Sequence, residues 1–101
     1  MAEVLTIEEL RTRIDVIDDQ LVRLLNVRVA CAVEVGRLKH EAGLPIYQPE
    51  REAQVLGRVR RSATDLSGPL TAEAVVRIFE RIIDEARRAE REASSRRDDL
   101  T

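Results

Sequence analysis

The chain has 101 residues and a mass of 11.5 kDa, which is enough for one domain and too little for two independent hydrophobic cores. Tyr47 and Phe79 are the only aromatic residues, so aliphatic side chains must fill the core, and stacking platforms for single-stranded nucleic acid are disfavoured. The 17 basic and 19 acidic residues give a net charge of -2, without the basic excess that neutralising nucleic-acid phosphates requires.

Cysteine usage and hydropathy bound the class of protein further. The single cysteine, Cys31, cannot form an internal disulfide, and no apolar run approaches the roughly 20 residues that cross a bilayer. The N-terminus has no signal-peptide pattern and the chain is short, so we expect a cytoplasmic protein without a fused regulatory domain. We assign Cys31 to packing and His40 to solvent, and without a second His or Cys we expect no metal site.

Residues 6–41 predict one long helix, because they contain no proline and only one glycine, Gly36. Thr6 is the expected N-cap, with Glu8 and Glu9 in the first turn at the positive end of the helix dipole. A 4-3 alternation then places nine residues on one stripe: Leu10, Ile14, Ile17, Leu21, Leu24, Arg28, Cys31, Val35 and Leu38.

Two breaks divide the rest of the chain into two further helices. Gly43 and Pro45 end the long helix, and Pro49 begins a second one whose apolar face comprises Val55, Leu56, Val59 and Ala63. Residues 67–69 break the chain again, and Thr71 caps a third helix carrying Val75, Ile78, Phe79, Ile82, Ile83 and Ala86. We expect a helical domain over residues 1–93 and a disordered tail over residues 94–101, which are mostly charged and small.

The predicted architecture is an all-α, three-helix subunit with one long N-terminal helix. That helix would be ~50 Å long at 1.5 Å per residue, which is too long for a compact monomer of this size. Its apolar stripe runs the whole length and would face water unless a second chain covered it. We therefore expect an obligate homo-oligomer, most simply an antiparallel two-fold dimer.

Three charged residues stand where apolar ones are expected. Arg28 lies on the stripe and Lys39 follows three turns later, whereas Glu90 continues the apolar spacing of the third helix. Each has a plain alternative: an interface salt bridge of Arg28 with Asp18 or Asp19 of the partner subunit, a solvated Lys39 near a helix end, and a helix that frays before Glu90.

Lysine usage favours a functional reading of Lys39. Sixteen of the 17 basic residues are arginine and Lys39 is the one lysine, which suggests a position that needs a compact ammonium group. Read from the residues alone, the chain is a helical dimer with a cationic cluster in an aliphatic cleft, which suits a small dianion.

The chain resembles the AroQ-type, all-helical chorismate mutases from about Leu5 to Glu90. The most specific matches are the AVEVG segment at residues 32–36 with Lys39, and the PERE segment at residues 49–52. Further matches are Leu10-Arg11, Ile14, Asp18, Leu24-Leu25, Arg28, Pro45-Ile46-Tyr47, Ile78-Phe79 and Ile82-Ile83. The resemblance implies an intertwined homodimer with two active sites and the Claisen rearrangement of chorismate to prephenate, a shikimate-pathway step of aromatic amino acid biosynthesis that needs no cofactor.

The resemblance also implies roles for individual residues. Arg28 and Arg11 of the partner subunit would hold the two substrate carboxylates. Lys39 would bond a carboxylate and the ether oxygen, and Glu52 would bind the ring hydroxyl. The remaining expected substrate contacts are Val35, Gln48, Arg51, Ile83 and Ala86. Arg11 lies ~25 Å from Arg28 along one helix at 1.5 Å per residue, so it can reach this site only from the other subunit.

The sequence departs from the family pattern at three positions. Glu90 stands where many relatives have a Gln that donates to the ether oxygen, Ala86 where some have Ser, and Gln48 where Asp is frequent. A glutamate donates only when protonated, so Glu90 predicts an activity that rises toward acidic pH.

The residues leave three alternative functions open. The chain could be an isochorismate pyruvate lyase or a 4-amino-4-deoxychorismate mutase of a secondary pathway, because the same cationic clamp suits either substrate. It could also be a weakly active subunit that needs a partner protein for full activity.

Overall fold

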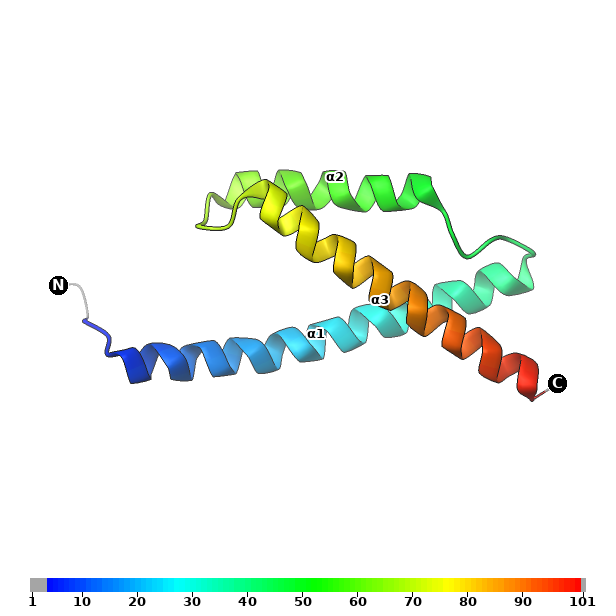
Figure 1. The fold of residues 1–101 in the computed structure, drawn as a ribbon, viewed down its shortest axis with the longest axis horizontal. Helices are drawn as coiled ribbons and strands as arrows, with labels where there is room; N and C mark the ends of the chain where they lie inside the picture. The colour runs from blue at the N-terminus through cyan, green and yellow to red at the C-terminus, as the bar shows by residue number, and fades with distance from the viewer. Residues whose placement is uncertain (1–3, 101) are drawn as a thin grey trace.

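A computed structural model describes residues 4–100, which form three α-helices and no strand (Figure 1). Helix α1 spans Ile7–Glu41, α2 spans Pro49–Leu66 and α3 spans Ala72–Asp99. The all-α, three-helix prediction is therefore confirmed, and residues 1–3 and 101 of the expected domain and tail lie outside the described residues.

Helix α1 begins at a capping box. The Thr6 hydroxyl accepts from the Glu9 backbone N–H at 3.1 Å, and the Glu9 carboxylate accepts from the Thr6 N–H at 2.9 Å. At the other end, Gly43 has a φ of 71°, a left-handed conformation that costs glycine little and turns the chain toward α2. The predicted start and end of the long helix are both confirmed.

The second break also depends on local backbone chemistry. Pro49 stands at the start of α2, after an N-cap Gln48 that makes no side-chain capping hydrogen bond. Ser67 ends α2 in the left-handed region, at φ 52°. Thr71 then caps α3, because its hydroxyl accepts from the Ala74 N–H at 3.0 Å.

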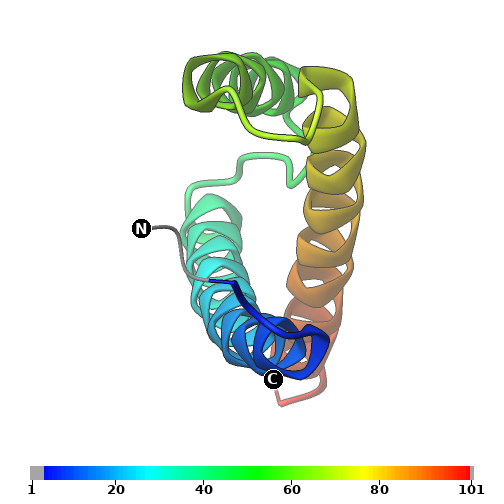
Figure 2. The same cartoon turned by 90° about the vertical axis from the view of Figure 1, so that its left-hand side faces the viewer.

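Helix α3 packs against both other helices and holds them apart. Figure 1 shows α3 running from α2 across α1, and the end-on view in Figure 2 shows α1 and α2 on opposite sides of an open arc. Val55, Val59 and Ala86, on α2 and α3, are the buried apolar side chains of the described chain. The small core therefore lies mainly between α2 and α3, and α1 remains largely uncovered.

The molecule is elongated. Its extents are 63 × 28 × 17 Å and its radius of gyration is 17.8 Å, against about 13 Å for a compact domain of 100 residues. Most of the predicted stripe on α1 faces solvent: the exposed fractions of Leu10, Ile14, Ile17, Leu21 and Leu24 are 45%, 53%, 51%, 50% and 65%. Among the described helices, none combines the length and the apolar character that a membrane span needs.

The C-terminal segment differs from the expected disordered tail, because α3 continues as helix to Asp99. Residues 90–99 contain neither glycine nor proline, and their arginines, their glutamates and Ala93 are good helix formers. The segment also lies near α1: the pKa of Glu34 is lowered by its hydrogen bond with Arg37 and further by the charge of Arg97. Composition alone therefore underestimated the length of this helix.

Candidate active site

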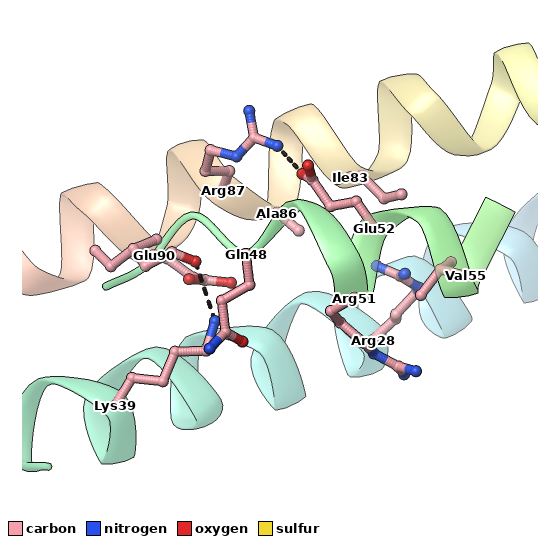
Figure 3. Close-up of a pocket in the computed structure, with 11 residues that line it drawn as sticks. Arg28, Lys39, Gln48, Arg51, Glu52, Val55, Ile83, Ala86, Arg87 and Glu90 are labelled. Atoms are coloured by element: carbon pink, nitrogen blue, oxygen red, sulfur yellow. Dashed lines mark hydrogen bonds and ion pairs between the residues drawn. The ribbon is translucent and has the colours of Figure 1, made fainter. Parts of the chain in front are cut away.

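A cavity of about 130 Å³ lies where the three helices and the loop before α2 meet (Figure 3). Helix α1 contributes two cations, the loop and first turns of α2 contribute polar groups, and α3 contributes an apolar wall that ends in two charged residues. The lining residues are Arg28, Lys39, Ile46, Gln48, Arg51, Glu52, Val55, Ile83, Ala86, Arg87 and Glu90. The cavity therefore brings together all of the predicted site residues except Arg11 and Val35.

Three of the lining cations have no carboxylate partner within the described part of the chain: Arg28, Lys39 and Arg51. The Arg28 guanidinium lies 5.9 Å from the centroid of the Phe79 ring, which orients it without neutralising its charge. The Lys39 Nζ donates to the backbone carbonyl of Ile46 at 3.0 Å. The cavity consequently presents uncompensated positive charge from two helices, as an anion-binding site requires.

The carboxylate of Glu52 is engaged by Arg87, a residue that the sequence pattern did not single out. The two side chains form an ion pair on the side of the cavity opposite α1 (Figure 3). The Arg87 guanidinium also lies 5.0 Å from the centroid of the Tyr47 ring and 3.8 Å from the Asp84 carboxylate. Arg87 stands four residues after Ile83, so the helical spacing that placed Ile83 on the inner face could have indicated it.

Glu90 lines the cavity from within α3, well before the end of the helix. Its Oε2 is buried and has no hydrogen-bond partner among the described residues. Burial raises the pKa of the Glu90 carboxyl, and the charges of Lys39, Arg87 and Arg91 oppose that rise. A buried, unpaired carboxyl with a raised pKa is a candidate proton donor.

Gly36 explains how Glu90 reaches this position. It is the one buried residue of α1, and a Cβ built at Gly36 would lie 3.2 Å from Oε2 and 3.3 Å from Cγ of Glu90. The glycine therefore lets the carboxyl group approach the backbone of α1, one turn before Lys39.

Two predicted residues lie outside the cavity. Arg11 is exposed in the second turn of α1, where the helix extends away from α2 (Figure 1). Val35 is 48% exposed on α1 and does not line the cavity. Within one chain, therefore, neither residue contributes to the site.

A profile described as "Chorismate mutase type II" matches residues 10–91, a range that includes every residue of the cavity. The chain belongs to this family. Two similar proteins have names that include chorismate mutase. A bifunctional chorismate mutase/prephenate dehydratase of Aquifex aeolicus is 40% identical over 78 residues, and a chorismate mutase of Methanocaldococcus jannaschii is 38% identical over 53 residues.

Coverage differs between these family members. The aligned part covers 76% of this chain but 22% of the Aquifex protein, and 52% of this chain but 54% of the Methanocaldococcus protein. A solved chorismate mutase structure from Thermus thermophilus, Form II, superposes with a TM-score of 0.79 at 32% identity. That match covers 84% of this chain and 93% of the other, so the three-helix fold is shared over almost the whole Thermus chain.

Proposed function

We propose that the chain is a chorismate mutase that rearranges chorismate to prephenate. The main support is that three cations without a carboxylate partner line one small cavity: Arg28, Lys39 and Arg51. Chorismate is a dicarboxylate, and arginine side chains match carboxylates with two parallel donors. Family membership supports the same reaction.

The chemistry suits these residue types. A pericyclic rearrangement needs no protein nucleophile, so the protein has two tasks: to hold the dianion in a compact, chair-like conformation and to stabilise charge on the ether oxygen as the C–O bond breaks. Arg28 and Arg51 perform the first task in this proposal. Ile83 and Ala86 contact the apolar parts of the substrate, and Gln48 lies at the polar end of the cavity.

Lys39 and Glu90 perform the second task. The Lys39 ammonium exchanges the Ile46 carbonyl for a substrate carboxylate and the ether oxygen, so that a positive charge lies where negative charge develops. Protonated Glu90 donates a hydrogen bond to the same oxygen. Because both interactions strengthen in the transition state, they contribute to kcat more than to substrate binding.

The proposed functional unit is an antiparallel homodimer. The exposed apolar face of α1 supports it, because apolar residues continue along the part of the helix that α3 does not cover. In such a dimer Arg11 of the partner subunit closes the site and binds the second carboxylate. It would supply the remaining contact that one chain lacks.

The test is to incubate the purified protein with chorismate, isochorismate and 4-amino-4-deoxychorismate separately and to identify the products. We expect prephenate from chorismate, and a loss of at least about a hundredfold in kcat/KM in Arg28→Ala and in Lys39→Ala. Arg58→Ala is the matched control, since Arg58 lies on α2 outside the cavity. No turnover of chorismate, alone or with cell extract, would contradict the proposal.

A further inference from the structure

We propose that Arg87 is a specificity-determining residue: by neutralising Glu52, it makes the site accept a ring hydroxyl and reject a ring ammonium. This inference rests on the proposed function, because it takes Glu52 as the group that binds the substituent of the substrate ring.

Several contacts keep the Arg87 guanidinium beside the Glu52 carboxylate. Both side chains are largely buried, with exposed fractions of 27% for Arg87 and 24% for Glu52. The Tyr47 ring lies 5.0 Å from the guanidinium, and Asp84 lies 3.8 Å from it. An arginine held by an ion pair and an aromatic ring has lost most of its conformational freedom, so it stays beside Glu52 when a substrate enters.

The charge of the pair decides which substituent can bind. A carboxylate has about four lone-pair sites on its two oxygens, so Glu52 can accept from Arg87 and still accept from a substrate hydroxyl. An ammonium in the same place would meet a carboxylate that is already neutralised, and beside it the guanidinium, whose groups only donate. The like charges would repel, and the half-buried position of the Glu52–Arg87 pair limits how far solvent screens that repulsion.

A second cavity adjoins the first at Glu52 and Arg87. It has a volume of about 180 Å³, shares Glu52, Ile83 and Arg87 with the first, and is also lined by the acids Glu80 and Asp84. Arg87 therefore stands between the proposed substrate position and two further carboxylates. Without its charge, three acidic side chains would favour an ammonium at the end of the site where Glu52 lies.

The experiment compares chorismate with 4-amino-4-deoxychorismate, which places an ammonium where chorismate has the hydroxyl. We expect the wild-type protein to have the higher kcat/KM with chorismate. Arg87→Met should shift the ratio of the two kcat/KM values toward the amino compound by about tenfold or more, which corresponds to ~1.4 kcal/mol in transition-state binding. Arg87→Lys retains the charge and should keep the wild-type ratio within about threefold. Arg88→Met is the matched control, because Arg88 is the exposed neighbour on α3.

Glu52→Gln tests the same idea without removing Arg87. It removes the closer of the two acidic partners of Arg87 and leaves only Asp84, at 3.8 Å. The preference for chorismate should therefore increase, opposite in sign to the effect of Arg87→Met. This variant also decides the question if Arg87→Met does not fold, as circular dichroism would show.

Binding measurements distinguish a failure of this inference from a failure of the proposed function. In the Lys39→Ala background, where rearrangement is expected to be slow, calorimetry gives Kd for both compounds with and without Arg87→Met. A shift of the Kd ratio supports the inference even if the wild-type protein turns over neither compound. A folded Arg87→Met protein with an unchanged ratio, or a wild-type protein that prefers the amino compound, would overturn it.

Discussion

Glu90 is the residue whose role depends most directly on its protonation. Burial raises the pKa of its carboxyl against the opposing charges of Lys39, Arg87 and Arg91, while Arg51 and Glu52 face the same cavity from α2. A protonated carboxyl can donate to the ether oxygen, whereas an ionised one would repel the charge that develops there.

We therefore expect kcat to fall as the pH rises through the pKa of Glu90, and the profile of Glu90→Gln to be flat over the same range. Steady-state rates measured from mildly acidic to mildly alkaline pH compare the two proteins. Arg28→Lys serves as a control that lowers activity without changing the titrating group. Superimposable profiles for the wild type and Glu90→Gln would remove Glu90 from the mechanism.

The same carboxyl links stability to pH. The folded state keeps the proton of Glu90 at pH values where the unfolded chain, with the ordinary pKa of 4.5, has released it. The free energy of unfolding should therefore fall as the pH rises from about 4.5 through the raised pKa. In denaturant unfolding at neutral pH, Glu90→Gln should be more stable than the wild-type protein. Its free energy of unfolding should not fall over this pH range. An equal loss of stability in both proteins would contradict this assignment.

Gly36 offers a test of position rather than charge. Because a Cβ there would lie 3.2 Å from the Glu90 Oε2, Gly36→Ala must displace the carboxyl by a few tenths of an ångström. Alanine favours helix over glycine by up to ~1 kcal/mol, so the fold should persist. We expect unchanged helicity by circular dichroism and about a tenfold lower kcat, given the sensitivity of catalysis to small misplacements. Gly57→Ala, with its nearest contact at 3.7 Å, is the matched control.

At the scale of the elements, the end of α2 is a place where the sequence is locally suboptimal. Ser67 adopts a φ of 52° and a ψ of 42°, a conformation in which a side chain costs about 1 to 2 kcal/mol relative to glycine. The turn after α1, at the other end of α2, uses Gly43 for a comparable φ of 71°. Ser67 therefore retains a strain that glycine would relieve.

Ser67→Gly should stabilise the protein by about 0.5 to 1 kcal/mol, after the larger unfolded-state entropy of glycine is subtracted. Ser62→Gly, the same substitution at an exposed position inside α2, should destabilise it by about 0.5 to 1 kcal/mol. Thermal unfolding of both variants measures the two shifts. Shifts of equal sign would contradict the assignment of strain to Ser67.

At the scale of the whole molecule, contacts within one chain do not account for the elongated shape, because they leave the apolar face of α1 exposed. Apolar side chains with exposed fractions near one half follow one face of α1, and burying such a side chain is worth about 1.5 to 3 kcal/mol. We therefore expect Ile14→Glu to dissociate the proposed dimer. Sedimentation velocity measures this, and Thr12→Glu, on the opposite face of α1, should leave the mass unchanged.

Subunit mixing tests whether the site is shared. Arg11→Ala and Arg28→Ala should each be inactive, and a mixture of the two should recover up to one working site per heterodimer if Arg11 acts from the partner subunit. Failure of recovery despite verified subunit exchange would contradict the shared site. Two Arg28→Ala preparations mixed together provide the baseline.

The sequence by itself determined the three helices and most of the cavity, because these depend on local signals. Proline, glycine and capping threonine residues fixed the ends of α1 and α2 and the start of α3, and helical spacing placed Arg28 and Lys39 on one face. It missed the end of α3 at Asp99, because a segment of charged and small residues suits either a solvated tail or a helix.

Only the tertiary structure decided which charges meet. The pairing of Arg87 with Glu52 joins α3 to α2, and the approach of Glu90 to Gly36 joins α3 to α1. Neither contact has a signature in the spacing of one helix, because each depends on the angle at which α3 crosses its neighbours. That crossing buries the Glu90 carboxyl and raises its pKa, and it leaves Arg28, Lys39 and Arg51 uncompensated around one cavity.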